Sequence, residues 1–336
     1  MTRAIPTCQF WIRAPGDGVL VEKSISGPDG DELLVETRYS GISRGTESLV
    51  FRGEVPESQY HEMRAPFQEG EFPGPLKYGY SSVGRVASAP ESHRFLEGKA
   101  VFCLFPHQDR YVVPASAVVP LPEGVPEERG VLAANMETAV NIVWDAGPSV
   151  GDRVVVVGGG VVGMLVAWLC QGIPGGKVRL IDIDPGREPV AEALDVPFAS
   201  QDPGAGDADV VVHASGSPEG LSTALAAAGS EARIVEASWF GSRTVPLPLG
   251  EAFHSRRLTL RSSQVGAIPP ERAPRWTHRR RLAVALDLLV DPRLDVLISG
   301  ESPFSELPDV MRRLSEEPSG TLCHRIRYRD ADARLL

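Results

Sequence analysis

Cysteines are few in this sequence and lie far apart. The 336 residues contain only Cys8, Cys103, Cys170 and Cys323, and no two of them form a CxxC pair. This spacing argues against a disulfide framework and against a zinc knuckle.

Basic charge and long apolar runs are also scarce. Thirty-four basic residues stand against 44 acidic ones, a net charge of −10, which argues against a nucleic-acid-binding protein. The densest basic cluster, 278–281, stands at the start of a segment whose apolar residues recur with helical period. We interpret the cluster as the solvated start of a helix. No apolar run approaches the ~20 residues that span a bilayer, and the N-terminal stretch lacks the apolar core of a signal peptide. We therefore expect a cytoplasmic protein that binds a small-molecule substrate and contacts neither nucleic acid nor membrane.

The length and the pattern along the chain indicate two domains. In the first ~130 residues, short alternating runs separated by Gly and Pro predict a partly barrel-like antiparallel β domain. Its strands are expected at Gly18–Glu22, Asp31–Tyr39, Ser82–Ala87, Ala100–Leu104 and Arg110–Pro114, before a helix over Val131–Trp144.

From Arg153 onward, apolar strands alternate with segments of helical period. The alternation predicts an α/β fold with a doubly wound parallel sheet. Its strands are expected at Arg153–Val157, Lys177–Ile183, Asp209–His213, Arg233–Ala237 and Leu258–Ser262, and its helices at Val161–Gln171, Arg187–Leu194 and Pro218–Ala228.

The last part of the chain changes pattern again. It predicts a helix over Arg281–Val290, a strand over Leu294–Ile298 and a closing strand over Cys323–Tyr328. Between these strands, Ser305 is expected to cap a helix whose apolar stripe is Leu307, Val310, Met311 and Leu314.

A glycine motif, Gly158-x-Gly160-x-x-Gly163, follows the strand Arg153–Val157 and opens a helix. Gly158 permits a tight turn, Gly160 lets the backbone approach a pyrophosphate, and Gly163 lets helix and strand pack closely. The free N–H groups of the helix N-terminus, which includes Val162, favour an anion. The motif therefore predicts a dinucleotide-binding site.

An acidic residue about 20 positions later would bind the 2′-hydroxyl of NAD. Asp182 and Asp184 both stand there, and Asp184, nearer the carboxyl end of the strand, is the preferred candidate. Asp184 would repel a 2′-phosphate, whereas Arg187 would accept one. We expect NAD(H) to be favoured over NADP(H).

Several motifs together resemble the medium-chain dehydrogenase/reductase superfamily, which includes zinc alcohol dehydrogenases and quinone oxidoreductases. Gly41-Ile-Ser-Arg-Gly-Thr-Glu47 is similar to its G-I-C-G-T-D segment with one extra residue, and Tyr78–Val86 is similar to G-H-E-x-x-G-x-V. Ser40–Glu47 and Pro269–Trp276 also resemble a narrower branch that includes the bacteriochlorophyllide hydroxyethyl dehydrogenases. The resemblance implies a GroES-like catalytic domain over 1–133, a Rossmann domain over 134–267, a C-terminal return over 268–336, and a homodimer.

The resemblance also locates where zinc members hold their catalytic metal. The matching positions here are Ser43, Tyr80 and Ala133 or Ala134, with Glu137 one helical turn away. Hydroxyl and methyl groups are poor zinc ligands. We expect no zinc.

Catalytic candidates follow from the same motifs. The resemblance directs Ser43, Thr46 and Tyr80 toward the substrate, with Tyr80 in the former metal position. Glu137 and His107 are the candidate proton relays. Alternatives remain open, because Tyr80 could serve packing alone, His107 could be a surface turn residue, and Glu137 could cap a helix or contact the ribose. Further cofactor contacts are expected at Arg44, Thr138, Ser215 and Gly266.

The resulting expectation is a zinc-independent NAD(P)-dependent oxidoreductase that transfers a hydride between nicotinamide and a carbonyl or secondary alcohol. Two alternatives remain open. One is an enone or quinone reductase of the same superfamily. The other is a relative that binds the dinucleotide without catalysis, because fold alone does not establish function.

Overall fold

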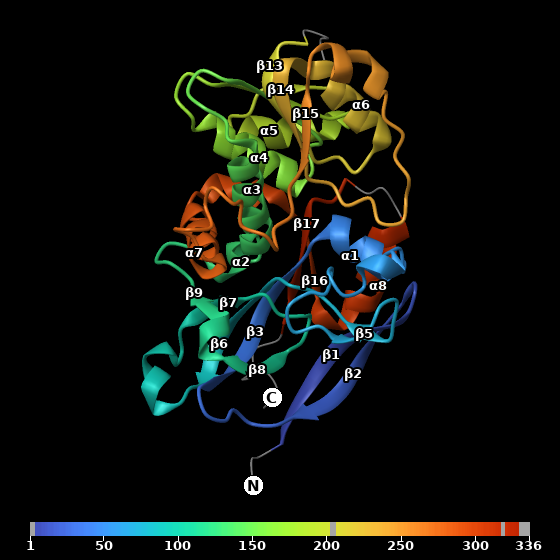
Figure 1. The fold of residues 1–336 in the computed structure, drawn as a ribbon. Coiled ribbons are helices and arrows are strands. Elements are labelled where there is room, and N and C mark those ends of the chain that lie inside the picture. The colour runs from blue at the N-terminus through green and yellow to red at the C-terminus, as the bar shows by residue number, and fades with distance from the viewer. Residues whose placement is uncertain (1–3, 202–205, 317–319, 329–336) are drawn as a thin grey trace. The chain divides into compact units, whose positions relative to one another are not determined.

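The computed structural model describes residues 4–201, 206–316 and 320–328 (Figure 1). The chain divides into two compact units, one of Met1–Ala134 with Leu286–Leu336 and one of Asn135–Ala285. The second unit is thus inserted into the sequence of the first. Each unit is described by itself below.

The first unit is built mainly from antiparallel strands. In chain order they are β1 (Ile5–Ala14), β2 (Asp17–Ile25), β3 (Glu32–Ile42), β4 (Glu69–Gly70), β5 (Leu76–Lys77), β6 (Ser82–Ser88), β7 (Ala100–Cys103), β8 (Arg110–Pro114), β9 (Val118–Pro120), β16 (Ile298–Pro303) and β17 (Cys323–Arg327). One sheet has the order β2-β1-β5-β4, and the other has the order β16-β17-β3-β6-β7-β9, with β8 paired to β3. Leu33, Val35, Val101 and Tyr111 lie in the core beneath the second sheet.

Helices of the first unit are short. They are α1 (Arg44–Phe51), α2 (Glu127–Gly130) and α8 (Leu307–Glu316), with 3-10 turns η1 (Glu57–Gln59), η2 (Glu91–Leu96), η3 (Ala115–Ala117), η6 (Pro292–Leu297) and η7 (Phe304–Glu306). The predicted apolar stripe of α8 is confirmed, because all four of its residues are buried.

Two expectations for the C-terminal part were wrong. Leu294–Leu297 belongs to η6 and the strand β16 begins only at Ile298. The Asp291 carboxylate accepts the Arg293 N–H and Pro292 opens the turn, so that Leu294 and Leu297 are buried three residues apart on a 3-10 turn. Ser305 lies inside η7, one turn before α8, and does not cap that helix.

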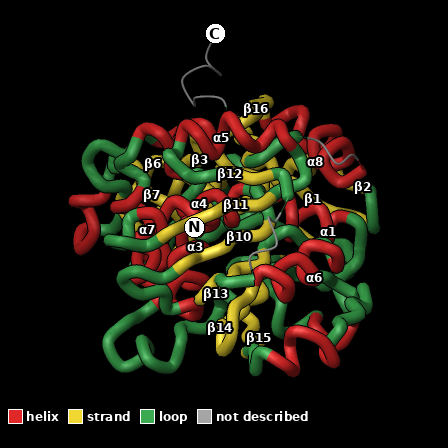
Figure 2. Tube along the Cα trace, turned by 90° about the horizontal axis from the view of Figure 1, so that it is seen from above, coloured by secondary structure: helices red, strands yellow, loops and turns green. Residues whose placement is uncertain are grey.

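The second unit has a single parallel sheet within its described residues. Its strands are β10 (Arg153–Val157), β11 (Lys177–Ile181), β12 (Phe198–Ala199), β13 (Ala208–His213), β14 (Ala228–Glu236) and β15 (Thr259–Ser262). They lie side by side in the order β12-β11-β10-β13-β14-β15 (Figure 2). This 3-2-1-4-5-6 order defines a Rossmann sheet, whose ligands bind at the carboxyl ends of the strands where the order reverses. That point lies between β10 and β13.

Helices precede, connect and follow the parallel strands. They are α3 (Ala133–Ala146), α4 (Val161–Gln171), α5 (Glu188–Ala193), α6 (Pro218–Ala227) and α7 (His278–Leu288), with a 3-10 turn η4 (Pro185–Arg187) and a π-helical segment η5 (Leu249–Phe253). The helix α4 contacts β10 and β11, and α6 contacts β10 and β13. Right-handed crossovers in opposite directions from the centre place α4 and α6 on opposite faces of the sheet.

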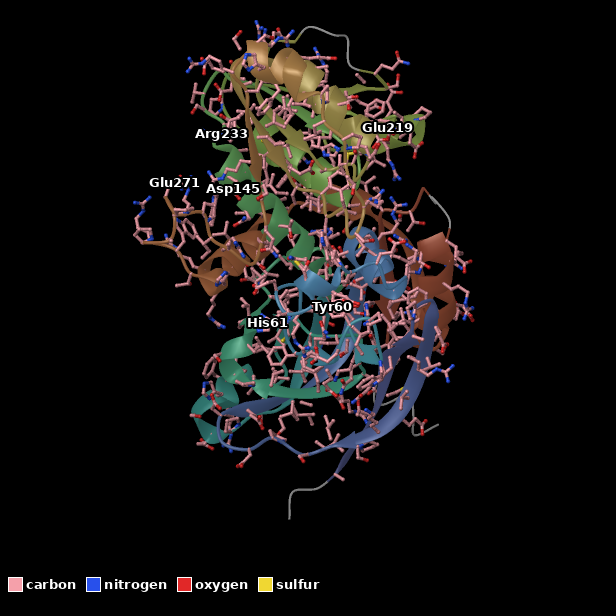
Figure 3. The ribbon with its side chains drawn as sticks, turned by 45° about the vertical axis from the view of Figure 1, so that its right-hand side comes forward. Tyr60, His61, Asp145, Glu219, Arg233 and Glu271 are labelled. Carbon is pink, nitrogen blue, oxygen red and sulfur yellow. The ribbon has the colours of Figure 1, made fainter. Side chains whose placement is uncertain are left out.

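The end of α3 is fixed to the edge of this sheet (Figure 3). The Asp145 carboxylate pairs with Arg261 of β15 at 2.8 Å, and Arg233 of β14 donates to the Ala146 carbonyl at 2.8 Å. Trp276 packs on Trp144 with ring centroids 4.7 Å apart. The Trp276–Trp144 contact joins residues 268–285, which the sequence suggested as part of a C-terminal return, to the second unit, which extends to Ala285.

The cluster 278–281 is not a uniformly solvated helix start either. Arg281 is only 1% exposed, and Arg280 stacks on the Trp276 ring at 3.9 Å. No helix formed by the described residues is long and apolar enough to cross a membrane.

Candidate functional site

The glycine motif forms the connection between β10 and α4. Gly158 has a φ of +112°, and a Cβ there would meet the Ser215 backbone nitrogen at 2.5 Å. A Cβ at Gly163 would overlap the Gly158 carbonyl oxygen, whereas a Cβ at Gly160 would meet open space. Gly160 is also the N-cap of α4, and Val162 lies in its first turn. The open backbone and the N–H groups of α4 therefore fit a dinucleotide pyrophosphate.

The geometry of the glycine motif predicts different effects for substitutions at Gly160 and Gly163. Gly160→Ala is expected to leave the melting temperature unchanged, because φ is −73° there and the space is open. The added methyl group is expected to weaken NADH binding about 10-fold or more, since it stands where the pyrophosphate approaches. Fluorescence titration measures the binding.

Gly163→Ala is the matched comparison. We expect it to destabilise the fold, because its methyl group overlaps backbone that cannot move aside. Equal melting temperatures for the two variants would contradict this assignment of the loop.

Of the two acidic residues after β11, Asp182 bonds the glycine loop and Asp184 bonds its own turn. Asp182 accepts hydrogen bonds from Gly159 N at 2.5 Å and from Asp184 N at 2.8 Å. Asp184 is more exposed, accepts from Gly186 N at 2.9 Å, and lies 3.3 Å from the Arg187 guanidinium. Between them, the Ile183 side chain is 91% exposed. No role was predicted for Ile183 from the sequence. An apolar residue between two aspartates at the end of a predicted strand is the pattern that could have pointed to it.

Ser215 follows β13 and belongs to a second cluster of polar side chains, which lies at the carboxyl ends of β13 and β14. Its Oγ lies 2.6 Å from His213 Nε2, and His213 Nδ1 lies 2.6 Å from Glu236 Oε2. His213 is fully buried, whereas Ser215 is exposed. The bonds fix the Ser215 hydroxyl, and the Ser215 backbone lies beside Gly158, but its role as a cofactor contact remains a prediction. His213 and Glu236 were missed because their partners come from two different strands.

Glu137 lies on α3 inside a buried polar group. Its carboxylate pairs with Arg281 at 3.1 Å, and Arg281 also donates to the Asn141 and Val265 oxygens at 2.5 Å each. Burial raises the pKa of Glu137, and the Arg281 charge opposes that rise. Arg281 thereby fixes the segment that contains Gly266, and Thr138 follows Glu137 on the helix. These contacts favour a structural role for Glu137, and its predicted proton transfer stays a prediction.

In the first unit, Tyr80 meets the N-terminal turn of α1. Its phenol is hydrogen-bonded by the side chains of Ser43, the N-cap, and Thr46. Burial raises the pKa of Tyr80 well above its usual range, the nearby Glu47 carboxylate raises it further, and the two hydroxyl bonds lower it. The structure thus brings together three of the predicted residues. Arg44 is the first residue of α1, beside Ser43.

His107 lies in the same unit and is 1% exposed. Its Nε2 lies 2.8 Å from Glu47 Oε2, and its Nδ1 lies 2.7 Å from Ser40 Oγ. Gly79 permits this position, because a Cβ there would meet the His107 ring at 2.8 Å and its φ is +125°. Both ring nitrogens of His107 are thus hydrogen-bonded to side chains of the first unit, and its predicted role as a proton relay stays a prediction.

The residues at the family's metal positions do not provide a zinc-binding donor set. Ser43 and Tyr80 offer neutral hydroxyls, and Ala133 and Ala134 offer methyl groups. Among the described residues, no three His, Cys, Asp or Glu side chains gather closely enough to hold a metal ion. Burial raises the pKa of the Cys103, Cys170 and Cys323 thiols to about 12, which disfavours the thiolate that binds zinc.

Comparison with known proteins identifies relatives over most of the chain. No model of a known protein family matches. The 2-desacetyl-2-hydroxyethyl bacteriochlorophyllide A dehydrogenase of Rhodobacter capsulatus is 28% identical over 312 residues, 88% of this chain and 90% of the relative. Two solved structures share the fold. L-idonate 5-dehydrogenase from Escherichia coli has a TM-score of 0.78 and 16% identity over 97% of this chain and 99% of its own. A dehydrogenase from Sinorhizobium meliloti, solved bound to NADP, has a TM-score of 0.75 and 19% identity over 96% and 99%.

The expected α/β architecture is confirmed by these neighbours and by the parallel sheet. Together, the relatives and the fold support placing this chain in the medium-chain dehydrogenase/reductase superfamily, among the alcohol dehydrogenase-like oxidoreductases that use a nicotinamide cofactor.

Proposed function

We propose that this chain is a zinc-independent oxidoreductase that interconverts a carbonyl compound and a secondary alcohol. The observation that carries the proposal is Tyr80, a protonated phenol held by Ser43 and Thr46 where the resemblance locates a metal ligand. A bound nicotinamide would supply or accept the hydride. We also propose a small-molecule substrate, action in the cytoplasm, and a place near the bacteriochlorophyllide branch, for which the 28% identity of the relative is the support.

Tyr80 would take over the task of polarising the substrate oxygen. Its hydroxyl donates a hydrogen bond to the carbonyl oxygen and transfers its proton as the alcohol forms. The hydroxyls of Ser43 and Thr46 lower the pKa of Tyr80 and would therefore favour the phenolate by donating to its oxygen. They stabilise the negative charge that the transfer leaves behind.

The second unit would hold NAD(H) or NADP(H). The glycine loop fits the pyrophosphate, and the exposed Ile183 offers an apolar surface for the adenine. We propose a preference for NAD(H), because Asp182 and Asp184 place two carboxylates just after the carboxyl end of β11. A similarly folded dehydrogenase was solved bound to NADP, so both nucleotides belong in the test.

The first experiment is fluorescence titration of metal-stripped protein with NADH and NADPH, repeated with added zinc and followed by panels of ketones, alcohols and enones. We expect NADH to bind without zinc and ketones or alcohols to be turned over. Binding that requires zinc would overturn the metal assignment. Turnover of enones alone would favour the enone reductase alternative, and tight binding without any turnover would favour the non-catalytic one. Light scattering in the same buffers checks the proposed homodimer.

Removal of each acidic side chain distinguishes the two carboxylates. Asp184→Ala is expected to narrow the preference for NADH over NADPH about 10-fold. The melting temperature should stay unchanged, because the Asp184 side chain is 45% exposed. Asp182→Ala is expected to weaken both nucleotides, because it also releases Gly159 from its hydrogen bond. Binding constants for both nucleotides test this, and a preference that changes only in Asp182→Ala would assign the selection to Asp182.

A further inference from the structure

A serine, a histidine and a glutamate form a chain of hydrogen bonds at the carboxyl ends of β13 and β14. Ser215 Oγ lies 2.6 Å from His213 Nε2, and His213 Nδ1 lies 2.6 Å from Glu236 Oε2. All three residues belong to the second unit. A hydroxyl on one ring nitrogen and a carboxylate on the other is the arrangement that activates a serine for nucleophilic attack.

The direction of these hydrogen bonds suits that chemistry. A carboxylate only accepts hydrogen bonds, so a neutral His213 ring that bonds Glu236 carries its hydrogen on Nδ1. Its Nε2 then has a lone pair toward Ser215 and can accept the hydroxyl proton. The other Glu236 oxygen accepts the Ser238 backbone N–H at 2.7 Å, which fixes the carboxylate. Ser238 Oγ is 3.5 Å from Nδ1 and is a weaker partner of the ring.

Ser215 stands on the turn that joins β13 to α6. It is exposed, although His213 is fully buried. The turn is tight because Gly216 has a φ of +68°, a value that favours glycine. Gly220 of α6 makes room for the pair, since a Cβ there would overlap Ser215 Oγ and lie 2.9 Å from His213 Nε2. A reactive serine on an exposed strand-to-helix turn has the same kind of placement.

The N-terminus of α6 adds a favourable charge at the same oxygen. Ser217, the N-cap of α6, donates its backbone N–H to Ser215 Oγ at 3.2 Å. The positive end of the helix therefore stabilises negative charge that develops on this oxygen as its proton leaves. Arg243 donates to the Gly216 carbonyl at 3.0 Å, which brings a cation to the same turn. Both groups favour attack by the serine oxygen.

We propose that Ser215 is a nucleophile that accepts an acyl group from an activated carboxylic ester, with His213 as its general base and Glu236 as the residue that positions the ring. Ser215 Oγ forms a bond to the carbonyl carbon while its proton passes to His213 Nε2. The bond from that carbon to the leaving alcohol then breaks, and His213 returns the proton to the departing oxygen. Water repeats the sequence, so that ester and water yield acid and alcohol. Acyl transfer needs no nucleotide and is therefore independent of the proposed function.

A fluorophosphonate tests the nucleophile directly, because its phosphorus is attacked by the same oxygen, loses fluoride and stays bound. The full chain is incubated with the probe at mildly alkaline pH, where imidazole groups are largely neutral, and peptide mass spectrometry locates the label. We expect Ser215 to carry the label and Ser215→Ala to remain unlabelled. Ser222, an exposed serine of α6 whose hydroxyl bonds the Pro218 carbonyl, is the matched control and should stay unlabelled.

The rate of labelling tests the two partners. His213→Asn should slow it about 100-fold or more, the usual contribution of a general base. In Glu236→Gln the amide oxygen takes the Ser238 N–H, so that its NH2 group faces Nδ1 and favours the ring form with hydrogen on Nε2. This variant should also react slowly, whereas Glu236→Asp, which keeps the charge, should retain more of the rate. Release of p-nitrophenolate from p-nitrophenyl acetate should follow the same order, and circular dichroism confirms that each variant is folded.

The labelling results decide between a reactive serine and a purely structural chain of hydrogen bonds. If no label reaches Ser215 in the wild type, the proposal is overturned even if His213→Asn does not fold. Equal rates in the wild type and a folded His213→Asn protein overturn it as well, and so does equal labelling of Ser215 and Ser222. Labelling of Ser215 that depends on both His213 and Glu236 establishes the site.

Discussion

Replacing Tyr80 with phenylalanine is expected to lower kcat for carbonyl reduction about 100- to 10,000-fold, the usual contribution of a general acid. The phenylalanine ring keeps the edge-on contact with Tyr78, whose centroid lies 6.1 Å away, so the fold should be retained. KM should change little, because the loss falls on proton transfer in the transition state. Steady-state kinetics with the substrate found by the panel measure both constants.

Tyr60→Phe is the matched control for this substitution. Tyr60 is labelled in Figure 3. Its substitution removes a phenolic oxygen from another loop of the first unit and retains the ring contact with Phe72, whose centroid lies 5.6 Å away. Its kcat should equal that of the wild type. A Tyr80→Phe enzyme with wild-type kcat on ketones would refute the assigned donor. An enone substrate, whose hydride goes to the β-carbon, would show only a small effect.

The second large effect is expected from Arg281→Ala, which should lower the free energy of unfolding by about 3–5 kcal/mol. Arg281 is 1% exposed and its removal leaves Glu137, which is 3% exposed, without its ion-pair partner. Urea unfolding of the full chain measures the change.

Two further variants test that explanation. Arg275→Ala removes an exposed arginine from the same segment and should stay within about 0.5 kcal/mol of the wild type. Arg281→Met combined with Glu137→Leu should recover most of the lost free energy of unfolding, because an apolar pair of similar volume avoids the cost of burying charge. If Arg281→Ala unfolds at the wild-type midpoint, the ion pair does not form in solution.

The sequence predicted best those elements whose cause is local. The bounds of β10 and α4 are as expected from the apolar run and the glycine motif beside them. The strand β1 was not predicted, because polar Thr7 and Gln9 are among its buried residues and hide the alternation. The Thr7 hydroxyl donates to Asp109 and accepts from Gln108, about 100 positions away, which no local pattern reveals.

The same distinction applies to the candidate site. Ser43, Thr46 and Tyr80 were found because each lies in a motif. Glu47 was part of the quoted motif, but its side-chain partner His107 lies 60 positions away and could not be predicted from that motif. The Ser40–Tyr328 contact spans 288 positions and depends on the pairing of β17 with β3.

That pairing also sets an order for folding during synthesis. The strand β3 leaves the ribosome early, but its neighbour β17 is translated only after the whole inserted unit of Asn135–Ala285. The inserted unit is continuous in sequence and needs no later segment, so it is free to fold on the nascent chain while β3 still lacks its partner. The inserted unit is therefore free to fold first, and the unit that carries Tyr80 is completed only once β17 has been made.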